Sequence, residues 1–138
     1  MNKPFAIFTI ALLALACGKE VDPTAMNSNP FDPQYNGENV FVFDTTYTQI
    51  ITIPGGAIVN HVIAVHVKEE LLPEGAAYAV RAVRVGTGEV TILNPDPPNS
   101  NSFKYQKVNP VVGVPECVRL SLFNNGSSAR PEQICATL

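Results

Sequence analysis

Beyond Glu38 the chain consists of short runs rich in Val, Ile, Thr, Tyr and Phe, and each run is soon interrupted by Pro, Gly or Asn. No stretch shows a convincing long helical periodicity. Branched and aromatic side chains suit a pleated surface, and the interrupting residues suit turns, so this pattern is typical of β-strands. It predicts an all-β domain over residues 39–138.

The runs define eight expected strands, and Lys68–Leu72 is the one segment expected to form a helical turn. Seven or eight strands in about 100 residues predict a β-sandwich. The expected strands are Val40–Phe43, Thr48–Ile53, Ile58–Val67, Tyr78–Val85, Glu89–Leu93, Phe103–Val108, Cys117–Phe123 and Gln133–Thr137. Within Cys117–Phe123, apolar and polar residues alternate, which predicts one buried and one solvated face.

The N-terminus has the pattern of a signal peptide over residues 1–16. One positive charge, at Lys3, is followed by twelve uncharged, mostly apolar residues, Phe5–Ala16. A bilayer-spanning helix needs about 20 apolar residues, so a retained transmembrane helix fits less well.

The segment Leu13-Ala14-Leu15-Ala16-Cys17 resembles the lipobox of bacterial lipoproteins, in which the chain is cut before the cysteine and its sulfur takes a diacylglycerol. It departs from that family at Ala14, where a larger aliphatic residue is usual. The resemblance implies lipidation of Cys17 and a membrane as partner through that lipid. The alternative is an ordinary secretory signal. Acyl chains would anchor the protein firmly, because each buried methylene contributes about 0.8 kcal/mol.

Residues 17–38 are polar and turn-forming, and they are expected to form a tether. Pro23, Pro30 and Pro33 remove backbone donors and bias the preceding residues toward extended geometry. The string Asn29-Pro30-Phe31-Asp32-Pro33 is similar to strings that follow the lipid in surface lipoproteins of the Bacteroidota. That resemblance implies a cell outer membrane location, on the periplasmic or the surface face.

Two cysteines, Cys117 and Cys135, remain once Cys17 is assigned to the lipid. An even pair in an exported chain predicts a disulfide, with buried free thiols as the alternative. If the two face each other across an antiparallel pair, the midpoint of the hairpin is Gly126, within a turn-rich loop. The cysteines and the turn residues therefore indicate the same register.

The C-terminal segments Cys117–Asn124, Gly126–Ala129 and Cys135–Thr137 resemble the last two strands of a bacterial fibronectin type III domain with a bridged terminal hairpin. Tyr78–Arg81, followed by Gly86, Gly88 and Val90–Leu93, is similar to the central strand pair of that family. The chain departs from the family in having no Trp and in having Val118 where a corner tyrosine is usual. The resemblance implies an immunoglobulin-like β-sandwich.

The charge of the chain argues against nucleic acid as a partner. It contains nine Lys or Arg and twelve Asp or Glu, and removal of residues 1–16 takes away Lys3, so the mature net charge is about −4. No basic run is present.

No metal, cofactor or catalytic site is expected. His61 and His66 lie five residues apart on one strand, so their side chains point to opposite faces and do not chelate one metal together. Glu69, Glu70 and Glu74 surround a turn without the ligand spacing of a calcium loop. The candidate nucleophiles Ser121, Ser127 and Ser128 lie in no nucleophile-elbow motif.

Binding is expected at the loops, where sandwich domains usually carry recognition. The candidate binding loop comprises Asn124, Asn125, Gly126, Ser127 and Ser128. Four aromatics, Phe31, Tyr35, Phe103 and Tyr105, offer stacking to a glycan, but the strand alternation favours the core for the last two.

These observations predict a non-catalytic interaction or structural module of the cell envelope, with an envelope protein or a glycan as partner. One alternative is a carbohydrate-binding accessory lipoprotein of a nutrient-uptake system, which predicts exposed aromatics in one plane at a loop end. A small hydrolase is the remaining alternative, and it predicts Ser, His and a carboxylate within reach of one another.

Overall fold

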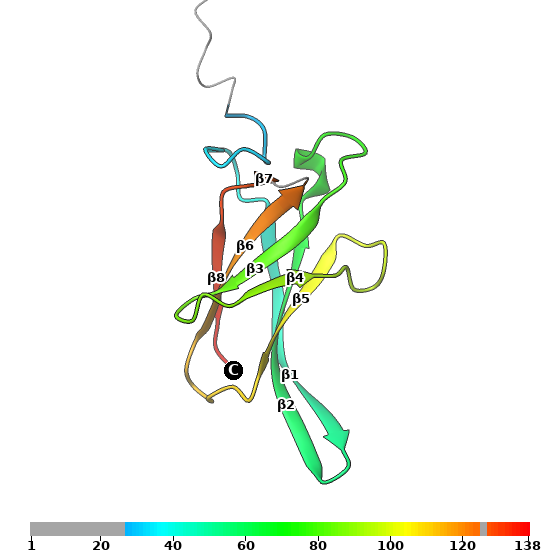
Figure 1. Ribbon diagram of the computed structural model, residues 1–138, viewed down its shortest axis with the longest axis vertical. Coiled ribbons are helices and arrows are strands. Elements are labelled where there is room, and N and C mark those ends of the chain that lie inside the picture. The colour runs from blue at the N-terminus through cyan, green and yellow to red at the C-terminus, as the bar shows by residue number, and fades with distance from the viewer. Residues whose placement is uncertain (1–26, 125–126) are drawn as a thin grey trace, which may run out of the picture.

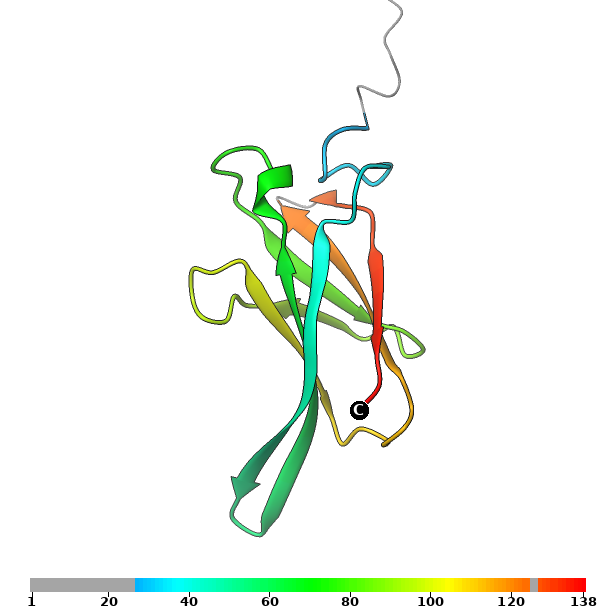
Figure 2. The same cartoon turned by 180° about the vertical axis from the view of Figure 1, so that it is seen from behind.

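The computed structural model describes residues 27–124 and 127–138. Over these residues the protein is an all-β sandwich of two antiparallel sheets, as the sequence predicts. One sheet has the order β1-β2-β5. In the other, β3 lies between β4 and β6, and both β7 and β8 pair with β6. Figure 1 and Figure 2 show the two layers from opposite sides.

The elements follow one another with short connections. They are β1 (Phe41–Ile53), β2 (Gly56–Val67), the 3-10 turn η1 (Glu69–Leu71), β3 (Ala79–Arg84), β4 (Val90–Leu93), β5 (Ser102–Val108), β6 (Glu116–Asn124), β7 (Ser127–Ser128) and β8 (Glu132–Ala136). Six of the expected strands and the helical turn are confirmed, with strand ends displaced by at most two residues.

The expectation of separate strands at Val40–Phe43 and Thr48–Ile53 is wrong, because β1 runs through both. Phe43 pairs with Val65 and Thr45 with Ala64, so Asp44 is an extra residue at a β-bulge. A bulge accommodates one unpaired residue without ending the strand, and the threonines that follow are good strand formers. The polar run Asp44–Thr46 is therefore a bend within β1.

The core lies between the sheets and is built from alternating residues, as the sequence pattern predicts. Fully buried side chains from β2 and β6 dominate it, together with Phe103 of β5 and Val80 of β3. The β2 and β6 members are Ile63, Val65, Val67, Val118, Leu120 and Leu122. Each such side chain contributes roughly 1.5–3 kcal/mol on burial.

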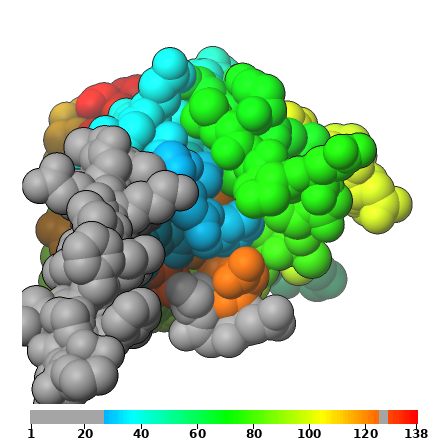
Figure 3. All heavy atoms as spheres, turned by 90° about the horizontal axis from the view of Figure 1, so that it is seen from above, coloured from blue at the N-terminus to red at the C-terminus, as the bar shows by residue number. Residues whose placement is uncertain are grey.

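Residues 27–40, which we call the N-terminal strap, pack across one end of the sandwich. Phe31 is 9% exposed and Tyr35 7%, and both belong to the core cluster. Viewed from that end, the strap (blue) sits between the η1 region and the end of β6 (Figure 3). The boundary expected between residues 38 and 39 thus falls inside a packed segment, because two aromatics of the tether join the core.

At the other end, β1 and β2 extend beyond the rest of the molecule. β5 accompanies β2 only as far as Asn60, which pairs with Val108. Residues 49–59, which we call the arm, continue as a two-stranded hairpin that projects from the sandwich (Figure 1). Its turn requires a glycine at Gly55, where φ is 94°.

Candidate functional site

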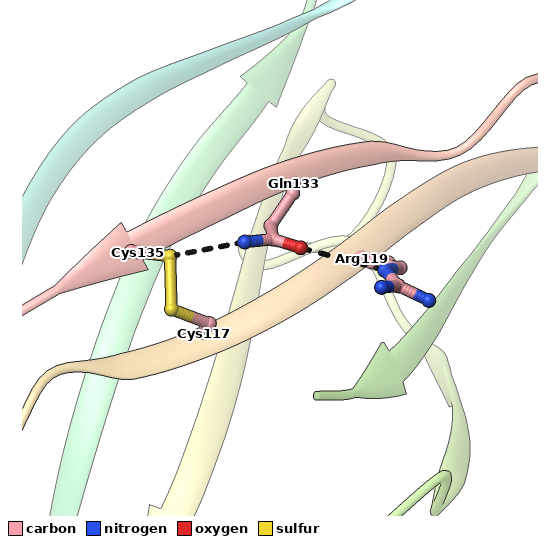
Figure 4. The surroundings of a disulfide bond; sticks show 4 residues. All are labelled: Cys117, Arg119, Gln133 and Cys135. Carbon is pink, nitrogen blue, oxygen red and sulfur yellow. Dashed lines mark hydrogen bonds between the residues drawn. A yellow bond between two sulfur atoms is a disulfide. The ribbon is translucent and has the colours of Figure 1, made fainter. Parts of the chain in front are cut away.

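The predicted disulfide joins Cys117 of β6 to Cys135 of β8. The two residues are direct partners in the ladder, their Cα atoms are 4.1 Å apart, and a bond links their sulfurs. Figure 4 shows that Gln133 lies beside the bridge, where its amide donates to Sγ of Cys135 at 3.5 Å and accepts from Arg119 at 3.4 Å. The register indicated by the sequence is confirmed at the cysteines.

The candidate binding loop is only partly within the described residues, because Asn125 and Gly126 lie outside them. Asn124 pairs with Ser127, and the hydroxyl of Ser128 is 3.2 Å from that of Ser121. This pairing is displaced by one residue relative to the cysteines. Pro131, which has no N–H for the ladder, separates the two paired regions.

The two histidines face opposite sides of β2, as predicted. His61 is 1% exposed, whereas His66 lies at the surface with Nδ1 2.6 Å from Oδ1 of Asp44. The hydroxyl of Thr46 donates to the Val62 carbonyl at 3.0 Å, so Nε2 of His61 is the donor in its 2.5 Å contact with that hydroxyl. Burial lowers the pKa of His61, and the charge of Glu116 partly opposes this effect.

The acidic residues near η1 are not arranged as a metal-binding cluster. Glu69 accepts a hydrogen bond of 2.9 Å from the Tyr78 hydroxyl. The pKa of Tyr78 is raised, first by burial and then by this bond and the charge of Glu69. Within residues 27–124 and 127–138, no group of three or more His, Cys, Asp or Glu side chains is arranged to hold a metal ion.

The four aromatics considered for glycan stacking are all buried. Phe103 and Tyr105 belong to the core, as the sequence favoured, and Phe31 and Tyr35 join it through the strap. The Tyr105 hydroxyl donates to Glu116 at 3.2 Å, and Arg84 binds the same carboxylate at 2.9 Å. Burial, followed by the charge of Glu116, raises the pKa of Tyr105 to about 12.

Sequence reasoning missed a groove at the side of the sandwich where β4 of one sheet lies next to β5 of the other. It lies between β4 and β5 and has a volume of about 350 Å³. Its lining includes Thr91, Asn94 and Gln106, and Lys104 binds Asp96 across 2.8 Å. The hydrogen bond to Asp96 raises the pKa of Lys104. No local motif indicates this groove, because it forms only when β4 and β5, which are consecutive in the chain, enter different sheets.

The arm is the second surface that sequence reasoning missed. Ile50 is 67% exposed, Ile51 41% and Ile53 42%. At the same end, the loop that follows β5 exposes Val111, Val112 and Val114 (Figure 1). The available signal was the uncharged run from Thr45 to Asn60, which composition alone does not distinguish from core strands.

The candidate lipidation residue Cys17 and the apolar stretch Phe5–Ala16 lie outside the described residues. Within the part of the chain that the structure describes, no helix is long and apolar enough to cross a membrane. Comparison with protein-family models, with curated proteins and with solved structures finds no match to this chain.

Proposed function

We propose that the protein is a lipid-anchored interaction module of a bacterial outer membrane, without catalytic activity, held by acyl chains on Cys17. The lipobox-like segment Leu13–Cys17 supports the anchor. The bridge between Cys117 and Cys135 suits an exported protein. The domain is proposed to be fibronectin type III-like, since the strand pairs that bear this resemblance, β3–β4 and β6–β8, both form.

The observation that favours an interaction role is the position of the arm. The strap, which follows the proposed anchor, covers one end of the sandwich, and the turn at Pro54–Gly55 lies at the other (Figure 2). β2 alone has 12 residues and is about 40 Å long. A lipid on Cys17 would therefore hold the membrane near the strap and present the arm and its exposed isoleucines away from it.

Two experiments test this proposal. A Cys17→Ala change in the full chain should leave the protein without lipid and remove it from the membrane fraction, whereas unchanged mass and fractionation would contradict the anchor. Full-length protein, solubilised with its envelope, should capture a partner, and the double change Ile50→Asp and Ile53→Asp should abolish capture. A matched change in the groove, Thr91→Asp, should leave that capture intact.

The groove between β4 and β5 favours one second candidate, carbohydrate binding. Its amide, hydroxyl and charged side chains are groups that hydrogen-bond sugars, and its volume suits a small ligand. The burial of Phe31, Tyr35, Phe103 and Tyr105 speaks against the aromatic platform that this candidate predicted. Glycan capture that survives the arm changes and is lost with Thr91→Asp would favour this candidate over the first.

The expectation that the protein is not a hydrolase stays a prediction. His61 contacts Thr46, and His66 contacts Asp44. A nucleophilic site of the serine type requires a hydroxyl that is hydrogen-bonded to a base, and a third group that orients the base. Measurement of esterase and peptidase turnover with the purified full chain tests this point.

A further inference from the structure

In the part of the chain that the structure describes, the free edge of β1 differs from the sheet edges formed by β4 and β5. From Thr45 to Ile53 it contains no charged residue, proline or glycine, and its members are Thr, Ile, Tyr and Gln. Natural proteins usually protect an edge with charges, proline, bulges or short strands. Both of those edges have such protection: the edge strand β5 contains Lys104 and Lys107, and the edge strand β4 has only four residues. In β1 the bulge at Asp44 offers such protection only at the start of this run.

Alternate residues of this run point their backbone groups away from β2. β2 uses Val67 N–H and the Val59 carbonyl toward the β5 side, so its even-numbered residues bond to β1. In β1, the residues that pair with these even-numbered residues therefore direct their backbone N–H and C=O groups toward β2. Examples are Tyr47, which pairs with Val62, and Gln49, which pairs with Asn60. The intervening residues Thr46, Thr48, Ile50 and Thr52 present N–H and C=O groups at the open edge.

The run is also complementary to itself. Its limits are the bulge at Asp44 and the turn at Pro54–Gly55, and its middle residue is Gln49. Antiparallel pairing about Gln49 places Tyr47 opposite Ile51 of the other copy, which is a favourable aromatic and branched pair. Thr46 then faces Thr52, and Thr48 faces Ile50. Symmetry brings no like charges together, because the run has none.

We propose that a second copy of this chain binds the free edge of β1, so that two β1 strands pair antiparallel about Gln49 and join the two three-stranded sheets into one. The outward groups would form about eight backbone hydrogen bonds in four pairs. The tip of each arm would reach the bulge at Asp44 of the other copy, close to its exposed Phe43. This proposal rests on the interaction role proposed above and names the partner.

A single edge-to-edge contact buries less than the roughly 1,200 Å² of a standard stable interface, so the dimer is expected to be weak in dilute solution. Anchoring on one membrane would raise the effective concentration of the copies. The test therefore captures the pair in place. In cells that express the full chain, Gln49→Cys puts one thiol from each copy across the symmetry axis, at the close side-chain distance of a non-hydrogen-bonded pair.

After treatment with the oxidant copper phenanthroline, Gln49→Cys should yield a cross-linked dimer. Ile53→Cys alone should not, because the two copies of that residue would lie about 27 Å apart. The double variant Thr45→Cys and Ile53→Cys should cross-link, because these positions face each other. Equal cross-linking of Ile53→Cys and Gln49→Cys, or no dimer with Gln49→Cys, would overturn the proposal.

Adding Thr48→Pro to Gln49→Cys should abolish the dimer, because it removes an outward N–H without removing a hydrogen bond to β2. Thr48→Lys, which preserves the backbone, should weaken it by placing like charges near the axis. A dimer that persists in both variants would contradict edge pairing. Capture of a different envelope protein through the arm, with no Gln49→Cys dimer, would leave the interaction role standing and refute self-pairing.

Discussion

The hairpins β6–β8 and β1–β2 use the same antiparallel pairing but have different surroundings. Leu120 in β6 is completely buried and a disulfide joins β6 to β8, whereas Ile50 in β1 is 67% exposed and belongs to a hairpin without a bridge. Runs rich in branched apolar residues thus form strands in both places. Whether their side chains stabilise the fold depends on a sheet lying opposite, which β6 has and the arm lacks.

The largest difference should come from truncating one apolar residue in each hairpin. Leu120→Ala should lower the free energy of unfolding by about 2–5 kcal/mol, because it leaves a cavity in the core. Ile50→Ala should change it by less than about 0.5 kcal/mol, because the side chain is already in water. Urea unfolding of both variants measures this difference. A similar loss in the two would mean that the arm is covered in solution.

Removal of the disulfide should have the next largest effect. Replacing Cys117 and Cys135 together by Ala should lower the free energy of unfolding by about 3 kcal/mol, because the bridge joins residues that are 18 positions apart and so restricts the unfolded chain. Thermal unfolding of the variant, compared with the wild type under non-reducing conditions, tests this value. An unaltered melting temperature would show that the disulfide does not contribute to the stability of the terminal hairpin.

Loss of the Glu132 carboxylate should release the strap from β8. This buried side chain accepts hydrogen bonds from the N–H groups of Val40 at 2.6 Å and Phe41 at 3.1 Å. Glu132→Ala leaves both N–H groups without this acceptor and should lower the free energy of unfolding by about 1–3 kcal/mol. Amide exchange should accelerate at these two residues but not in the arm. Glu132→Gln, which keeps one acceptor, should lose less.

The smallest effect concerns pH at the base of the arm. The pKa of His61 is lowered on folding, so the unfolded chain binds a proton on this residue more readily than the folded protein does. The free energy of unfolding is therefore at its full value above about pH 6.5 and decreases as the pH falls below it. His61→Gln should flatten this acidic decrease. Urea unfolding of the variant and the wild type between pH 5 and 8 measures this effect, and parallel curves for the two proteins would contradict this assignment.

The strands, the turn at η1 and the disulfide register were predictable because they depend on local patterns. Alternation within β6 indicates its buried face directly, and Cys117 pairs with Cys135 as their spacing about a turn-rich loop predicted. The strap was not predictable in the same way. Phe31 and Tyr35 lie in a proline-rich segment. The strap that carries them is hydrogen-bonded through Val40 and Asn39 to Glu132 and Arg130, about 90 residues further along the chain.

The sequence by itself determined that this chain forms β-strands, where most of them begin and end, and which cysteines face each other, because side-chain periodicity and turn residues act over short distances. The tertiary structure alone decided which apolar strand remained exposed. β5 stops at Val108, Asn109 adopts a φ of 50°, and Pro110 has no N–H for the ladder, so the arm receives no third strand. The groove between β4 and β5 likewise depends on the tertiary structure, because these two consecutive strands enter different sheets.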